Sequence, residues 1–158
     1  MSFASNPFIV LTYVSGPAVL TNASVLFLMS TTNRFARAID RARYLAEHLK
    51  TPTASLRQEI AIAGRRVRLI AMTMNGLYIA AATFALATLM VLAGAALENA
   101  LSVLLFDAMV GAAILCGLVG LVAFVVAAWA MVIESRLAMR AVAMETRDAL
   151  ALVDEALT

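Results

Sequence analysis

The sequence is poor in the residues that build catalytic and metal sites. Its 158 residues include one cysteine, Cys116, one histidine, His48, and one lysine, Lys50. A lone cysteine excludes a disulfide within the chain, and a single histidine excludes a Cys/His zinc cluster. The sequence also lacks the GxxxxGK[ST], GxGxxG and HExxH patterns of phosphate, dinucleotide and zinc-peptidase sites. We therefore expect no catalytic residue, no metal and no cofactor, and we do not expect an enzyme.

Charge is also scarce. Only 14% of the residues are charged and 63% are hydrophobic, whereas soluble domains carry roughly 25% charged residues. Three uncharged stretches, 8–32, 69–97 and 108–133, exceed the ~20 apolar residues that cross a bilayer as a helix. Their apolarity is continuous and does not alternate, which favours helices over barrel strands. The sequence predicts an all-α integral membrane protein with three transmembrane helices.

Basic residues are absent from one side of these stretches. All twelve arginine and lysine residues lie in 33–68 or after 133, together with eight acidic residues, a net charge of +4. The other side holds only Glu98 and Asp107, a net charge of −2. The positive-inside rule then predicts an outer N-terminus and a cytoplasmic C-terminus. We expect a multi-pass protein of the bacterial cytoplasmic (inner) membrane.

The segments between and after the spans have helical periodicity. Apolar residues recur at helical spacing on both sides of Pro52, which predicts an antiparallel, coiled-coil-like hairpin with its turn near 51–55. Neither glycine nor proline occurs after Val132, so the third span and the tail can form one helix. The expected order is an N-terminal tail and first transmembrane helix (1–32), a cytoplasmic hairpin (33–68), a second transmembrane helix (69–97), an outer loop (98–107), a third transmembrane helix (108–133) and a cytoplasmic C-terminal helix (134–158).

A polar stripe follows the first span. At about 100° per residue, one face of this helix collects several polar or flexible side chains, and a second asparagine lies in the next span. An asparagine in lipid is costly, so we expect these amides to face protein or water. Two interpretations stay open, namely contacts between helices and a polar path through several copies. The candidates for pore lining or helix packing are Thr12, Ser15, Asn22, Met29, Asn33 and Asn75.

Arginines flank the inner ends of the first two spans. They are expected either to form a basic inner vestibule or to bind lipid headgroups, although ordinary topology also accounts for them. The candidates are Arg34, Arg37, Arg41, Arg65, Arg66 and Arg68. The three predicted spans contain no acidic residue, which disfavours an ion-selectivity filter built from carboxylates. Small residues four apart predict close helix contacts, at Gly76/Ala80, Ala113/Gly117 and Cys116/Gly120.

The segments "NPFIVLTYVSGPAVLTNASVLFLMSTTNRFARAIDRAR" and "RQEIAIAGRRVRLI" resemble an uncharacterised family of small bacterial membrane proteins, domain of unknown function 2721. The resemblance rests on the Asn33-Arg34 step, the Asp40-Arg41 pair and the Arg65-Arg66 approach to the membrane. It implies a three-span integral membrane fold over most of the chain. It brings no activity, substrate or catalytic residue.

Two functions are compatible with these patterns. The favoured one is a homo-oligomeric channel-like or pore-forming assembly with the first transmembrane helix nearest the axis. The alternative is a non-catalytic, membrane-anchored interaction or scaffold protein that uses its cytoplasmic hairpin and tail. The expected partners are membrane lipids and further copies of the chain, with a cytoplasmic protein partner left open and no nucleic acid.

Overall fold

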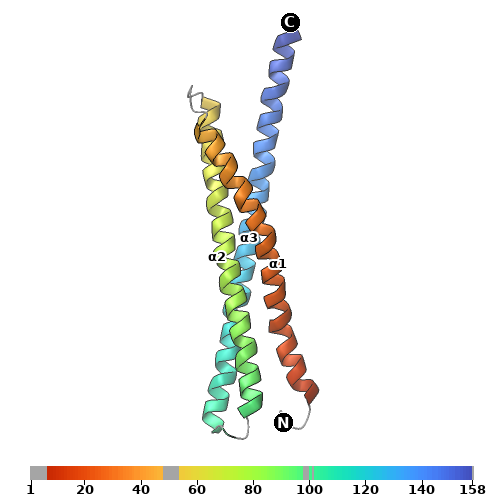
Figure 1. Ribbon diagram of the computed structural model, residues 1–158, viewed down its shortest axis with the longest axis vertical. Coiled ribbons are helices and arrows are strands. Elements are labelled where there is room, and N and C mark those ends of the chain that lie inside the picture. Colours follow the sequence, from red (N-terminus) through yellow and green to blue (C-terminus); the bar gives the residue numbers. More distant parts are fainter. Residues whose placement is uncertain (1–6, 48–53, 98–99, 101, 158) are drawn as a thin grey trace. The chain divides into compact units, whose positions relative to one another are not determined.

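The chain forms three long helices. The computed structural model describes residues 7–47, 54–97, 100 and 102–157. They form α1 (Pro7–Glu47), α2 (Ala54–Leu97) and α3 (Val103–Leu157) (Figure 1). No strand occurs within these ranges, and each helix contains a stretch long and apolar enough to cross a membrane. The all-α class is thereby confirmed for these ranges, and the three apolar helices support a multi-pass membrane protein.

Each helix runs beyond its predicted span. α1 continues past Thr32 to Glu47, α2 begins well before Leu69, and α3 joins the third span to the tail without a break. This agrees with the near absence of helix-breaking residues in these segments, since a helix continues from lipid into water wherever its backbone bonds are kept. Residues 51–53 of the predicted turn at 51–55 lie outside the described residues, and Ala54 and Ser55 already belong to α2. The hairpin therefore stays a prediction.

The start of α3 differs from the expected outer loop at 98–107. The amide of Ala100 donates to the carbonyl of Leu97 at 2.8 Å, and the amide of Phe106 donates to the carbonyl of Ser102 at 3.0 Å. Helix therefore begins at Val103, before the charged Asp107. The predicted boundary relied on that charge. An exposed aspartate marks solvent, however, and does not end a helix.

The described residues form two compact units. The first contains parts of 1–30 and 74–127, and the second contains parts of 31–73 and 128–158. All three helices contribute to each unit.

The first unit is packed through small residues. On α2, buried residues recur at alternating spacings of three and four, which is typical of a helix seam; they are Leu77, Ala80, Phe84 and Ala87. A Cβ added to Gly120 would lie 2.6 Å from Thr83 Oγ1 and 2.8 Å from a ring carbon of Phe84. A Cβ added to Gly76 would lie 3.1 Å from Cβ of Ala127. The predicted close contacts at Gly76 and Gly120 are confirmed, whereas Gly117 has no neighbour within 4 Å of such a Cβ.

Hydroxyl groups of this unit bond to their own helices. Ser24 Oγ donates to the carbonyl of Leu20 at 2.8 Å, and Thr21 Oγ1 donates to the carbonyl of Pro17 at 2.9 Å. Most large exposed side chains of this unit are apolar, such as Val19 and Leu26. The hydrocarbon core of a bilayer offers no hydrogen-bonding partner, so satisfied hydroxyls and a largely apolar exterior suit this unit to lipid.

Candidate functional site

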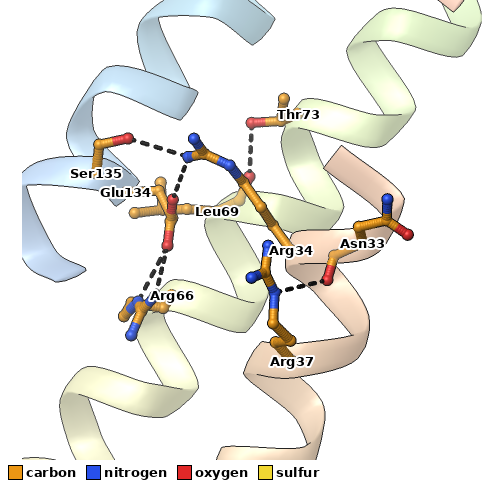
Figure 2. A network of polar contacts seen from close by, with 8 residues as sticks. All are labelled: Asn33, Arg34, Arg37, Arg66, Leu69, Thr73, Glu134 and Ser135. Carbon is orange, nitrogen blue, oxygen red and sulfur yellow. Dashed lines mark hydrogen bonds and ion pairs between the residues drawn. The ribbon is translucent and has the colours of Figure 1, made fainter. Parts of the chain in front are cut away.

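A buried carboxylate joins the three helices of the second unit. The side chain of Glu134, on α3, is 4% exposed. Its Oε1 accepts hydrogen bonds from Nε of Arg66 at 3.0 Å and from Nη2 of Arg66 at 2.9 Å. Its Oε2 lies 3.5 Å from Nη1 of Arg34, on α1 (Figure 2). Removing a carboxylate from water costs several kcal/mol unless charges and hydrogen bonds compensate it, and two guanidinium groups do so here.

Further contacts orient the arginines around this carboxylate. Arg34 Nη1 also donates to Oγ of Ser135 at 3.3 Å, one residue after Glu134 on α3. Arg37 Nε donates to the backbone carbonyl of Asn33 at 3.2 Å, within α1 (Figure 2). The guanidinium carbon of Arg41 lies 5.9 Å from the ring centre of Tyr44, within the range of a cation–π contact.

These side chains surround a cavity of about 500 Å³. We call it the arginine cavity, and it lies within the second unit. Its volume is in the range of small-molecule sites, about 300–1,000 Å³. Four arginines and one glutamate line it, a net charge of +3. The lining residues are Arg34, Arg37, Ala38, Arg41, Ala63, Arg66, Glu134, Ser135 and Ala138.

The order of charges along the chain explains why these groups meet. Arg34 is the first charged residue of the sequence, Arg66 lies just before the second uncharged stretch, and Glu134 directly follows the third. Three helices that cross one bilayer bring these stretch ends to the same depth. Alanines at three lining positions leave room for the arginine side chains.

The structure divides the predicted basic residues into two sets. Arg34, Arg37, Arg41 and Arg66 line the arginine cavity. Arg65 and Arg68 are exposed and lie outside its lining. Glu134 was not singled out from the sequence. The sequence feature that could have identified it is its position. It is the first charged residue after a long apolar run, at the boundary where arginines of two other helices also lie.

All six candidates for pore lining or helix packing are exposed. They are Thr12, Ser15, Asn22, Met29, Asn33 and Asn75. Thr12 Oγ1 donates to the carbonyl of Phe8 at 2.9 Å, and Ser15 Oγ donates to the carbonyl of Thr12 at 3.0 Å. The side chains of Asn22 and Asn75, in contrast, make no hydrogen bond with any described residue.

The face of α1 that carries Asn22 lies opposite its buried face. Buried α1 residues occur seven positions apart, at Ser24, Thr31 and Ala38. Ser15 and Asn22 repeat at the same interval and are exposed. The exposed series is offset from the buried series by two residues, as Asn22 is from Ser24, which corresponds to about 200° around a helix. Asn22 therefore points away from the contacts that α1 makes within its own chain.

The chemistry of the second unit is that of a positively charged polar cavity. Within the described residues, no three His, Cys, Asp or Glu side chains come together as metal ligands would. The acceptor oxygens of Glu134 face arginine donors. The groups available to a ligand are thus guanidinium N–H groups and the Ser135 hydroxyl, which are hydrogen-bond donors suited to an anion.

The sequence profile of a family described as "Protein of unknown function (DUF2721)" matches residues 14–144. The chain belongs to this family. The part shared with DUF2721 contains Asn22, Asn75 and every residue that lines the arginine cavity. The resemblance noted from the Asn33-Arg34 and Arg65-Arg66 steps is thereby confirmed. No match to this DUF2721 chain was found among curated proteins or among solved structures.

Proposed function

We propose that this DUF2721 protein is the subunit of a homo-oligomeric, channel-like assembly with α1 nearest the axis. The observation that supports this proposal most is the exposed side-chain amide of Asn22. Its amide is exposed within an uncharged helical stretch, makes no hydrogen bond with the described residues, and lies opposite the buried face of α1. A bare amide in lipid is unfavourable, and intramembrane polar groups often line pathways. Neighbouring copies or water would satisfy it.

Other residues of α1 are consistent with this arrangement. Ser15 and Met29 share the line of Asn22 at intervals of seven residues, and both are exposed. One copy offers three spanning helices, which are too few to enclose a path alone. A conduit therefore requires several copies, with this polar line turned inward.

The charge asymmetry gives the assembly an orientation. We infer that the N-terminus lies outside the cytoplasmic (inner) membrane of a bacterium and that 33–68 and the C-terminal part of α3 lie in the cytoplasm. The support is that every basic residue falls on one side of the three uncharged stretches.

The test combines oligomeric state with ion flux. The purified protein in nanodiscs should have the mass of several copies, and liposomes that contain it should pass ions. Asn22→Leu should change this flux by severalfold, because it replaces the amide nearest the axis. Asn75→Leu is the matched control, since it makes the same change at an exposed asparagine of α2.

Three results would contradict the proposal. A monomeric protein in nanodiscs would exclude the assembly, and an oligomer that passes no ions would exclude the conduit. A flux that responds to Asn75→Leu and not to Asn22→Leu places α2, and not α1, nearest the axis.

The alternative function is a membrane-anchored scaffold. It is favoured by the length of α3, which continues from the third uncharged stretch to Leu157, and by exposed apolar residues Met139 and Val142. Such a platform would bind a cytoplasmic protein. Reversing the exposed charges of Arg43 and Arg140 should then abolish recovery of that partner in a pull-down and leave oligomeric state unchanged. Flux without any recovered partner would oppose this alternative.

A further inference from the structure

We propose that the arginine cavity binds a phosphate-bearing anion, with Arg37 as a direct ligand. The ligand chemistry is a phosphate ester or free phosphate, held by guanidinium groups of α1 and α2. This inference goes beyond the proposed assembly, because the cavity lies within one chain. It holds whether or not copies associate.

The charge balance of the lining is the first argument. Glu134 is the one carboxylate among the lining residues, and it already contacts both Arg34 and Arg66. The net charge of the lining, with Glu134 included, is +3. Positive charges crowded around one cavity repel each other, so an anion in their midst lowers the electrostatic energy.

Arg37 is the best-placed direct ligand. Its Nε donates to the carbonyl of Asn33 on its own helix, and its two terminal nitrogens make no hydrogen bond or ion pair with the described residues. They provide paired N–H donors toward a cavity that they help to line. The planar guanidinium fork matches two oxygens of a phosphate, which a single lysine ammonium does not.

Arg34 and Arg66 remain accessible despite their contacts with Glu134. Their side chains are 41% and 27% exposed, whereas that of Glu134 is 4% exposed. The carboxylate thus holds two guanidinium groups in place, and part of each arginine side chain stays exposed. This arrangement fixes the two donor groups and leaves them open to a ligand.

The depth of the cavity indicates a phosphate source. Arg34, Arg66 and Glu134 occur at the ends of three uncharged stretches, where headgroup phosphates of a bilayer lie. Basic pockets between transmembrane helices on the cytoplasmic side bind anionic headgroups. A phospholipid headgroup is therefore the first source to test, and soluble phosphate is the second.

The experiment measures binding to lipid-depleted, purified protein. Native mass spectrometry gives apparent dissociation constants for phosphatidylglycerol and for zwitterionic phosphatidylcholine, and calorimetry does so for inorganic phosphate. Arg37→Gln should weaken phosphatidylglycerol binding roughly tenfold, because it removes a charged hydrogen-bond donor. Arg43→Gln is the matched control, since Arg43 is an exposed arginine of α1 outside the cavity lining. It should change binding by less than about twofold.

The results separate the sources and can overturn the site. Tight phosphatidylglycerol binding without phosphate binding identifies a lipid headgroup. Phosphate binding that depends on Arg37 and excludes phosphatidylglycerol identifies a soluble ligand. Absence of both, equal affinity for phosphatidylcholine, or equal losses in Arg37→Gln and Arg43→Gln would overturn the proposal. None of these readouts depends on flux or subunit number, so the proposed assembly stands or falls separately.

Discussion

Glu134 depends on two arginines that contribute unequally. Arg66 donates two hydrogen bonds to Oε1, at 3.0 and 2.9 Å, whereas Arg34 reaches Oε2 with one contact of 3.5 Å. Arg34 is also the more exposed of the two, so water screens its charge more strongly. Most of the compensation for burying this carboxylate therefore comes from Arg66.

The two arginines are expected to differ on substitution. Arg66→Gln should lower the free energy of unfolding by about 2 kcal/mol, because the buried carboxylate loses its two charged hydrogen bonds. Arg34→Gln should lower it by about 1 kcal/mol or less. Unfolding of both variants in the same detergent checks the order. Equal losses, or a larger loss for Arg34→Gln, would show that the 3.5 Å contact matters more than its geometry indicates.

A double variant tests whether buried charge is the cause. Glu134→Gln added to Arg66→Gln neutralises the carboxylate that Arg66 no longer compensates. We expect the double variant to be more stable than Arg66→Gln alone, since an unpaired buried charge is the costly species. Thermal unfolding of the two proteins side by side measures this difference. Additive losses would mean that the contacts, and not the charge, account for the effect.

At the scale of the helix, α2 and α3 approach each other closely at Gly120. A Cβ there would meet Thr83 Oγ1 at 2.6 Å and a ring carbon of Phe84 at 2.8 Å. Phe84 is 1% exposed, so its ring has little room to move. Gly117 lies one turn earlier on α3 and faces open space. The two glycines thus form a matched pair with opposite expectations.

Gly120→Ala should destabilise the protein by about 1–3 kcal/mol, the usual effect of overfilling a packed contact. Gly117→Ala should be neutral or should stabilise it by about 0.5–1 kcal/mol, because alanine is the better helix former and meets nothing there. Unfolding of both variants in detergent, monitored by helical circular dichroism, distinguishes them. If Gly120→Ala does not lower the stability, α2 and α3 lie farther apart at this position than these distances indicate.

The helices themselves were predictable from local patterns. Uncharged runs, helical spacing and the lack of glycine or proline after Val132 indicated three helices that extend beyond their spans, as observed. The spacing rule for small residues could not separate Gly117 from Gly120, because both satisfy it. Which of them faces α2 depends on the rotation of α3 about its axis. That rotation is decided by packing and not by a local pattern.

For the whole molecule, the candidate site was predictable in part. Arg34, Arg37, Arg41 and Arg66 were identified as a basic group because they flank the first two uncharged stretches. Their carboxylate partner was not, because Glu134 reads as the first residue of a polar tail when one helix is considered alone. Aligning three helices at a common depth is what turns a tail residue into the centre of a charge network.

The same depth argument predicts the orientation of the chain in the membrane. If positive charge is retained in the cytoplasm, position 64 should lie inside the cell and position 103 outside it. Gly64 suits a cysteine label because an added Cβ meets nothing within 4 Å, and Val103 suits one because it is 78% exposed. Both substitutions are made in a Cys116→Ala background, which removes the single native thiol.

A membrane-impermeant maleimide applied to intact cells should label Val103→Cys and leave Gly64→Cys unlabelled until the inner membrane is permeabilised. Cys116→Ala alone should stay unlabelled in both conditions. The reverse pattern would place all twelve basic residues outside, against the charge rule. The arginine cavity would then face the outer leaflet, and its phosphate ligand would have to come from that side. The labelling pattern thus decides which leaflet is used to test the cavity.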